Sequence, residues 1–86
     1  QGLSAARRHI RALAIRPTSD VTFESATEFA CSEGASGPEL AALWAALEAD
    51  LAASTGDGRP QRIRTLAARP WHPEASRILR AAAGPP

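Results

Sequence analysis

The side chains that could carry catalysis are few in this sequence. There is one cysteine, Cys31, and there are two histidines, His9 and His72. A nucleophilic cysteine needs a base that is itself held by a third group, and no local motif brings these residue types together. Cys31 lies in an apolar stretch next to Phe29 and Ala30, which is typical of a small buried thiol. We therefore predict that the protein is not an enzyme and has no catalytic residues.

Metal and cofactor sites are not indicated either. Zinc sites use pairs of Cys or His at short spacing, as in CxxC or HxxxH, and one cysteine with two distant histidines does not provide them. The stretch 55–58, Thr-Gly-Asp-Gly, has neither the GxxxxGK[ST] pattern nor a preceding strand, so it indicates a turn between helices. We predict no metal and no cofactor.

The length of 86 residues allows one domain with a small core, because only 15 residues are Leu, Ile, Val or Phe whereas 20 are Ala. We place this single helical domain at residues 3–84. Residues 1–2 are interpreted as the remnant of a protease site used to remove a tag, and residues 85–86 as the start of a Pro-rich linker or tail.

The expected location is the cytoplasm. No apolar run approaches the roughly 18 residues of a membrane span, and no secretory signal is present. A single cysteine cannot form an internal disulfide, so a reducing compartment is the default. We predict no membrane partner.

Apolar residues recur at helical spacing along the chain, and no alternating run or hairpin signal competes. The second helix has two candidate starts: a cap at Thr18, Ser19 or Asp20, or a capping box of Ser25 and Glu28 after an extended stretch 21–23. The predicted fold is all-α, a compact bundle of five to six short, mostly antiparallel helices. Their predicted ranges are 3–16, a second helix ending at residue 32, 38–53, 60–69 and 73–83.

The helix expected over 38–53 is the clearest element, with Pro38 at its first turn. One side of it carries the apolar residues that should form the spine of the core. They are Leu40, Leu43, Trp44, Leu47 and Leu51. The other side carries alanines, which either form a solvated helix face or let a second element or partner pack closely. They are Ala42, Ala45, Ala46, Ala49 and Ala53.

Charge is divided into three segments. Residues 1–16 contain four arginines and no acid, residues 17–58 contain eight acids and no base, and residues 59–86 contain six arginines and one acid. One interpretation is that the basic ends flank the acidic middle inside the bundle and form ion pairs across it. The other is that single-sign surfaces meet a partner or a second copy of the chain.

From the charge pattern we predict a non-catalytic protein–protein interaction or assembly domain that pairs through opposed basic and acidic faces. The alternative is a nucleic-acid-binding domain that uses the arginines of the first and fourth helices. The alternative is less favoured, because the pI is about 8.3 and eight carboxylates separate the basic segments. The candidate interaction residues are Arg7, Arg8, Arg11, Glu24, Glu28, Glu33, Arg62 and Arg64.

The stretch 69–73, Arg-Pro-Trp-His-Pro, is expected to be a rigid elbow between the last two helices. In a chain so poor in core residues, we expect Trp71 to fold inward over Leu43, Trp44 and Leu47. The alternative is an exposed aromatic anchor for a partner.

The size, the short antiparallel helices and the segregated charge resemble the death-fold class of interaction domains, including bacterial CARD-like and effector-associated modules. The matching feature is architecture, with Arg7, Arg8 and Arg11 opposed to Glu24, Glu28 and Glu33. The resemblance implies homotypic assembly that recruits an attached effector, in bacteria often for defence against phage.

Overall fold

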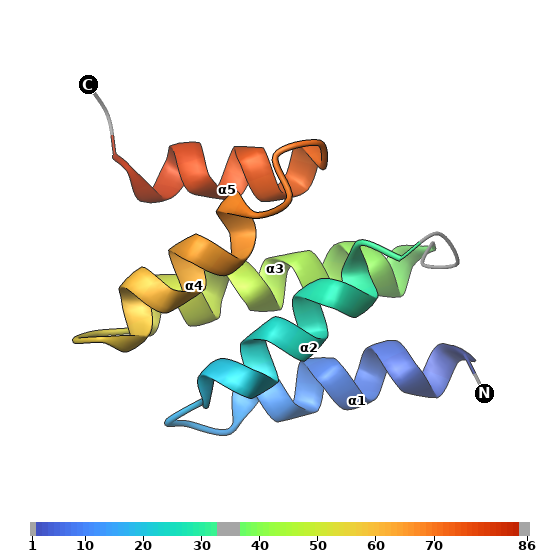
Figure 1. Ribbon diagram of the computed structural model, residues 1–86. Coiled ribbons are helices and arrows are strands. Elements are labelled where there is room, and N and C mark those ends of the chain that lie inside the picture. Colours follow the sequence, from blue (N-terminus) through green and yellow to red (C-terminus); the bar gives the residue numbers. More distant parts are fainter. Residues whose placement is uncertain (1, 33–36, 85–86) are drawn as a thin grey trace.

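The computed structural model describes residues 2–32 and 37–84, and within these ranges it is all-α. Five helices are present where five to six were expected, and no strand occurs in the described ranges (Figure 1). The expected linker at residues 85–86 lies outside them. The helices are α1 Gly2–Ala14, α2 Asp20–Ala30, α3 Pro38–Ala53, α4 Gly58–Ala67 and α5 Pro73–Ala82.

Helix α3 is the centre of the bundle and contacts all four other helices. Successive helices reverse direction, and α1 and α5 lie on different sides of α3 (Figure 1). The corner between α1 and α2 lies at the lower left of that view, whereas the start of α3 and the α4–α5 connection lie at the right. The corner between α1 and α2 and the connection between α4 and α5 thus lie at different ends of the elongated molecule.

The start of α2 is set by Ser19. Its backbone is extended and its hydroxyl accepts a hydrogen bond of 3.1 Å from the amide of Thr22, one of the first-turn donors that a helix leaves unpaired. The alternative of an extended stretch 21–23 followed by a Ser25 cap is wrong, because these residues are already helical. Inside the helix, the buried Thr27 hydroxyl donates to the carbonyl of Phe23 at 2.8 Å, which satisfies its polar group.

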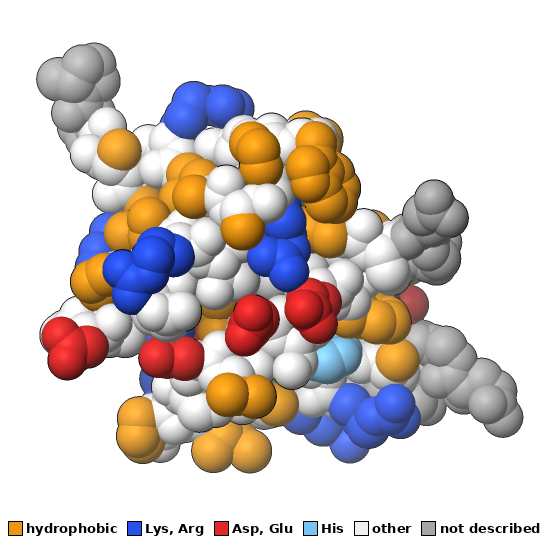
Figure 2. Space-filling model, in the orientation of Figure 1, with side chains coloured by type: hydrophobic (Ala, Val, Ile, Leu, Met, Phe, Trp, Pro, Cys, Tyr) orange, Lys and Arg blue, Asp and Glu red, His pale blue; other side chains and the backbone are white. Residues whose placement is uncertain are grey.

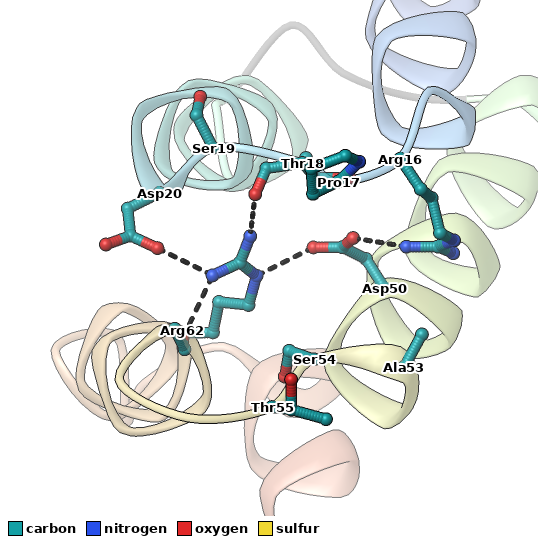
Figure 3. Close-up of a pocket in the computed structure, with 11 residues that line it drawn as sticks. Arg16, Pro17, Thr18, Ser19, Asp20, Asp50, Ala53, Ser54, Thr55 and Arg62 are labelled. Carbon is teal, nitrogen blue, oxygen red and sulfur yellow. Dashed lines mark hydrogen bonds and ion pairs between the residues drawn. The ribbon is translucent and has the colours of Figure 1, made fainter.

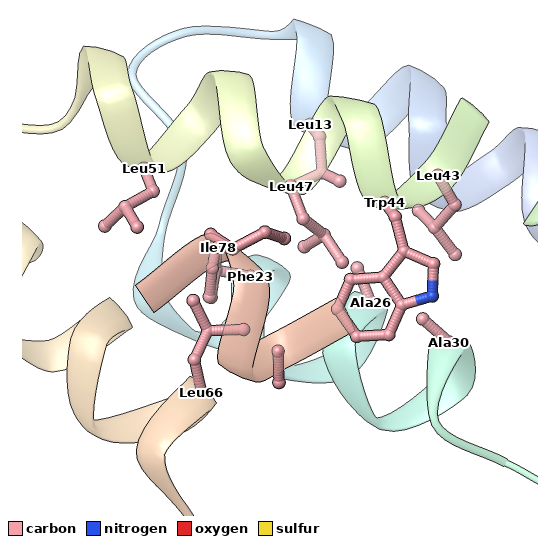
Figure 4. Close-up of a cluster of buried hydrophobic side chains, with 11 residues drawn as sticks. Leu13, Phe23, Ala26, Ala30, Leu43, Trp44, Leu47, Leu51, Leu66 and Ile78 are labelled. Carbon is pink, nitrogen blue, oxygen red and sulfur yellow. The ribbon is translucent and has the colours of Figure 1, made fainter. Parts of the chain in front are cut away.

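The core forms between α3 and the helices around it (Figure 4). The predicted spine of α3 is confirmed, with Leu40 half-buried and the other four members buried. In α1, Ala6 and Leu13 are also buried, whereas Ala14 is exposed. The other buried apolar residues are Phe23, Ala26, Ala30, Leu66, Ala75 and Ile78.

His9 joins α1 to α2 by stacking its ring on Phe29, with 5.1 Å between ring centroids. Burial, and secondarily the nearby Arg8, lower the pKa of His9 below 6.5. Because the folded state binds this proton less readily than the unfolded chain, the associated stability is present above pH 6.5 and is lost as the pH falls through the folded pKa.

We therefore expect the free energy of unfolding, measured by urea titration, to fall between pH 7.5 and pH 5 by more in the wild type than in His9→Gln. All other titratable groups are the same in the two proteins, so the difference between their pH dependences isolates the contribution of His9. Equal pH dependence in the two proteins would show that His9 is not coupled to folding.

Candidate functional site

The most buried charges of the domain form one network around Arg62 of α4 (Figure 3). Its Nε donates to Asp50 of α3 at 2.8 Å, and its Nη1 donates to Asp20 of α2 at 2.6 Å and to the Gly58 carbonyl at 3.0 Å. Its Nη2 donates to the Thr18 carbonyl at 2.6 Å. The side chains of Arg62 and Asp50 are 4% and 2% exposed, so this ion pair is almost fully withdrawn from water.

Burial of Arg62 corrects one sequence-based expectation. We expected its guanidinium to project from the surface toward a partner or nucleic acid, but it ties α4 to α2, α3 and the α1–α2 connection. A buried guanidinium must be paired, and the aspartates at positions 20 and 50 meet that demand. Arg64, the other candidate on α4, is exposed and donates to Gln61 of its own helix.

Ion pairing inside the fold accounts for much of the charge segregation. Seven ion pairs occur among the described residues, and six of them join the acidic segment 17–58 to one of its basic flanks. The interpretation that the basic ends flank the acidic middle is therefore confirmed for these pairs. The exposed pairs among them contribute about 0 to 1 kcal/mol each to stability. Their main effect is therefore to favour this arrangement of the helices, in which opposite charges face each other.

The remaining candidate interaction residues lie on α1 and α2. Arg7, Arg8 and Arg11 are exposed on α1, and Arg7 reaches Glu39 of α3 at 3.7 Å. Glu24 and Glu28 are exposed on α2, and Glu28 reaches Arg69 at 3.8 Å. Figure 2 shows acidic side chains in a row over α2 and basic side chains over α1 on one face. Glu33 lies outside the described residues.

Trp71 does not fold into the core: the residue is 65% exposed, and the expectation of a core lid is wrong. The amide of His72 donates to the carbonyl of Arg69 at 3.1 Å, which closes a four-residue turn with Pro70 in its second position and Trp71 in its third. A residue at the tip of such a turn points to solvent. The segment thus turns the chain from α4 into α5, as expected, and its tryptophan faces outward.

His72 occupies the place over Trp44 that was expected for Trp71. The rings of His72 and Trp44 are 4.8 Å apart, and those of His72 and Trp71 are 5.7 Å apart. His72 also caps α5, because its Nδ1 accepts a 3.2 Å hydrogen bond from the amide of Glu74. Three aromatic side chains therefore form a continuous row from the core to the surface.

An apolar groove of about 540 Å³ lies beside this row, between α3 and the beginning of α5. Exposed Ala41 and Ala45 and half-buried Leu40 contribute from α3, and the buried Trp44 and the half-buried His72 complete the apolar lining. We call Trp71 together with these five residues the Trp71 surface.

Charged residues form one edge of the groove. Arg77 of α5 donates to Glu74 at 3.0 Å and to Glu48 of α3 at 3.2 Å, and these two hydrogen bonds raise the pKa of Arg77. Two carboxylates thus share one guanidinium, and the edge keeps an excess of one negative charge. The groove is therefore apolar along its length and acidic at this edge.

A second cavity of about 640 Å³ surrounds the buried ion-pair network. Its charged groups already bind one another, with Asp50 held by Arg62 on one side and by Arg16 at 2.6 Å on the other. It is therefore better explained as the solvent-facing side of a structural network. Within residues 2–32 and 37–84, no group of three His, Cys, Asp or Glu side chains is placed to hold a metal ion.

The groove was not predicted from the sequence, although part of its α3 wall was noted there. The alanines on the outer side of α3 were noted as a surface on which a partner could pack, and Ala45 lines the groove. The position of α5, which forms the opposite wall of the groove, could not be predicted from the sequence. The exposed apolar residues Ile15 and Val21, each 70% exposed, were also missed.

Comparison with known proteins gives no relative. No family model matches the chain, and neither a curated protein nor a solved structure matches it significantly. In the described part of the chain, none of the helices is both long enough and apolar enough to cross a membrane.

Proposed function

We propose that this chain is a non-catalytic protein–protein interaction domain that binds through the Trp71 surface. The observation that carries the proposal is the 65% exposure of Trp71, next to an apolar groove, in a domain with few large apolar residues. An exposed tryptophan in such a domain leaves unused an apolar area that the small core could have buried. Binding of a partner would bury that area.

The geometry around Trp71 suits an anchor residue. The turn closed by His72, the proline at position 70 and the contact with the His72 ring restrict the tryptophan before any partner arrives. Restricting an anchor in advance lowers the conformational entropy that binding must remove. Tryptophan is also among the residue types that most often dominate binding energy at protein interfaces.

The proposal includes an adaptor or recruitment role within a larger protein, as the resemblance to death-fold interaction domains implies. Its support is the five-helix all-α architecture and the presence of exposed basic and acidic side chains on α1 and α2. Arg8, Arg11 and Glu24 have no ion-pair partner among the described residues, so they remain available to steer a charged partner. A cytoplasmic location is part of the same proposal, because the one cysteine cannot form an internal disulfide.

Selection of peptides from a phage-displayed random library on the immobilised domain tests the proposal. We expect binders whose affinity, measured by fluorescence anisotropy, falls at least about tenfold for Trp71→Ala, as for an anchor worth more than about 1.4 kcal/mol. Because the side chain is exposed, we expect the same substitution to change the free energy of unfolding by less than about 1 kcal/mol.

Arg80→Ala is the matched control, since Arg80 is an exposed residue of α5 without an ion pair among the described residues. Binding should be unchanged in this variant. Recovery of no binder, or of binders that tolerate Trp71→Ala, would contradict the proposed function. A large loss of stability in Trp71→Ala would mean that the tryptophan serves the core after all.

A further inference from the structure

His72 is a titratable ring inside the Trp71 surface. It lies between the two tryptophans, with its ring centroid 4.8 Å from that of Trp44 and 5.7 Å from that of Trp71. Histidine is the side-chain type that ordinarily changes its charge between pH 5 and pH 8. A change of charge on this ring therefore occurs within the binding surface itself, in contact with the residue that we propose as its anchor.

The hydrogen bond of the ring shows which form of His72 the fold uses. The amide of Glu74 donates to Nδ1 of His72 at 3.2 Å. A backbone N–H only donates, so Nδ1 must hold a lone pair, and the ring in this arrangement is neutral. A protonated ring carries hydrogen on both nitrogens and cannot accept this bond. Its charge would also lie at the N-terminus of α5, where the helix dipole disfavours a cation.

The capping bond belongs to a set of contacts that hold the turn of Trp71 on α5. The Ser76 hydroxyl donates to the carbonyl of Pro70 at 3.2 Å, and the Ser76 amide donates to the carbonyl of His72 at 3.1 Å. Trp71 therefore lies between two residues that are bound to the first turns of α5. The ring of His72 adds to this attachment only while its Nδ1 can accept a hydrogen bond. Protonation thus loosens the turn without removing its backbone hydrogen bonds.

Carboxylates in the groove offer the protonated ring other partners. Charged side chains come from each element around the turn, and they are Glu48 of α3, Glu74 and Arg77 of α5, and Arg69, which pairs with Glu28 of α2. The two acids of the groove share the guanidinium of Arg77 and keep an excess of negative charge. A charged imidazole has two donors, so it gains partners by turning toward these acids, which takes it out of the capping position.

From this geometry we propose that His72 makes binding at the Trp71 surface dependent on pH: the neutral ring holds the turn in its binding arrangement, and protonation releases it. The inference rests on the proposed function, because it assigns a form of regulation to the same surface. The binding form is the deprotonated one. Affinity is therefore complete above the pH range in which His72 titrates, and it falls as the pH drops through that range, because a smaller fraction of the protein is ready to bind.

Fluorescence anisotropy measures this dependence with an acetylated, library-selected peptide that contains no histidine. The two pH values are 7.5 and 5.5, between which Asp and Glu side chains ordinarily stay ionised. Circular dichroism checks that the domain is folded at both. We expect the dissociation constant of the wild type to rise about threefold to tenfold at pH 5.5, as the fraction of neutral His72 falls.

His72→Asn is the variant that isolates the titration. The asparagine side chain keeps an oxygen that accepts from the amide of Glu74, as at many helix starts, but it does not titrate. Its dissociation constants at the two pH values should agree within about 1.5-fold, even where loss of the ring lowers both affinities. His9→Gln is the matched control, because it removes the other histidine of the chain and should show the same change as the wild type.

A nitrogen-15 correlation spectrum of the free domain gives a readout that needs no peptide. Between pH 7.5 and pH 5.5, we expect the amide signal of Glu74 and the indole signal of Trp71 to move in the wild type. The first reports on the capping bond and the second on the turn. Both signals should stay in place in His72→Asn.

Three results would overturn the proposal. They are a wild-type affinity that is the same at both pH values, an equal change in the wild type and in His72→Asn, and signals of Glu74 and Trp71 that do not move in the free wild type. If peptides nevertheless bind in a Trp71-dependent way, control by His72 is wrong and the proposed function stands. If no peptide binds in that way, the proposed function is wrong and this inference falls with it.

Discussion

Arg62→Ala is expected to destabilise the domain more than any other substitution on its charged residues. The variant leaves Asp50, with 2% of its side chain exposed, without its buried partner, and it frees the Thr18 carbonyl from its hydrogen bond. Breaking a buried ion pair from one side costs about 3 to 5 kcal/mol. In a domain of 86 residues each kcal/mol lowers the melting temperature by about 4 to 8 °C, so we expect a fall of at least 12 °C or so.

Urea unfolding followed by circular dichroism measures this loss of stability, and two further variants serve as comparisons. Arg64→Ala, on the same helix but exposed, should change the free energy of unfolding by about 0.5 kcal/mol or less. Arg16→Ala should cost less than Arg62→Ala, because Asp50 keeps its buried partner Arg62 on α4 and the side chain of Arg16 is 44% exposed.

The double variant Asp50→Leu with Arg62→Met removes both charges at once. We expect it to recover about half or more of the stability lost in Arg62→Ala, because an apolar pair of similar volume often replaces a buried ion pair without loss. A double variant that is less stable than Arg62→Ala would contradict this expectation. It would show that Arg62 stabilises the fold mainly through its hydrogen bonds to Thr18 and Asp20, and not by pairing the buried charge of Asp50.

Trp44→Ala is expected to have the second large effect, in contrast to Trp71→Ala. Trp44 is 3% exposed, packs in the core between α3 and α5, and stacks on His72. Removing so large a buried side chain costs about 3 to 5 kcal/mol. The two tryptophans of the chain should therefore differ several-fold in their effect on the free energy of unfolding.

Trp44→Phe separates packing from hydrogen bonding at this position. The indole Nε1 of Trp44 is buried and has no hydrogen-bond partner among residues 2–32 and 37–84, so phenylalanine removes a donor unsatisfied there while it keeps much of the apolar contact. We expect a loss below about 1.5 kcal/mol, as for other substitutions that roughly conserve apolar volume. A loss as large as that of Trp44→Ala would indicate that the indole nitrogen makes a contact that the buried geometry does not show.

Local patterns in the sequence predicted the helices well. The spacing of Leu43, Leu47 and Leu51 identified the buried side of α3, and prolines at 38 and 73 identified the first turns of α3 and α5. The start of α4 was placed at Pro60, two residues late, because proline is typical of a first turn and Gly58 is a poor helix former. In the structure Arg59 is already helical, and its guanidinium donates to the carbonyls of Leu51 and Ala82. Helix periodicity and capping act within a few residues, so one sequence reveals them.

Contacts between distant segments could not be predicted in this way. Arg62 looked like a surface arginine because its partners Asp20 and Asp50 are 42 and 12 residues away along the chain. Trp71 looked like a core residue because the sequence does not show that His72 covers Trp44. In both cases the burial of the residue depends on how the helices pack against one another. A single sequence does not show that packing.

The buried network and the proposed binding surface are connected through the packing of the helices. Arg62 fixes α4 against α2 and α3, and the turn at residues 69–72 follows directly from α4. The position of Trp71 relative to the groove on α3 therefore depends on a part of the structure that lies outside the Trp71 surface. Destabilising Arg62 should weaken binding as well as folding, whereas Trp71→Ala should weaken binding alone.

The most direct test of the proposed binding surface uses the two indole N–H groups of the chain, one on Trp44 and one on Trp71. A nitrogen-15 correlation spectrum of the labelled domain, recorded with and without a selected peptide, reports on both groups and on every backbone amide. We predict that the Trp71 indole signal and the amides of Ala41 and Ala45 shift on binding, and that signals of the exposed side of α2 do not. Shifts confined to α1, α2 or α4, with the Trp71 indole signal unchanged, would contradict the assignment of this surface.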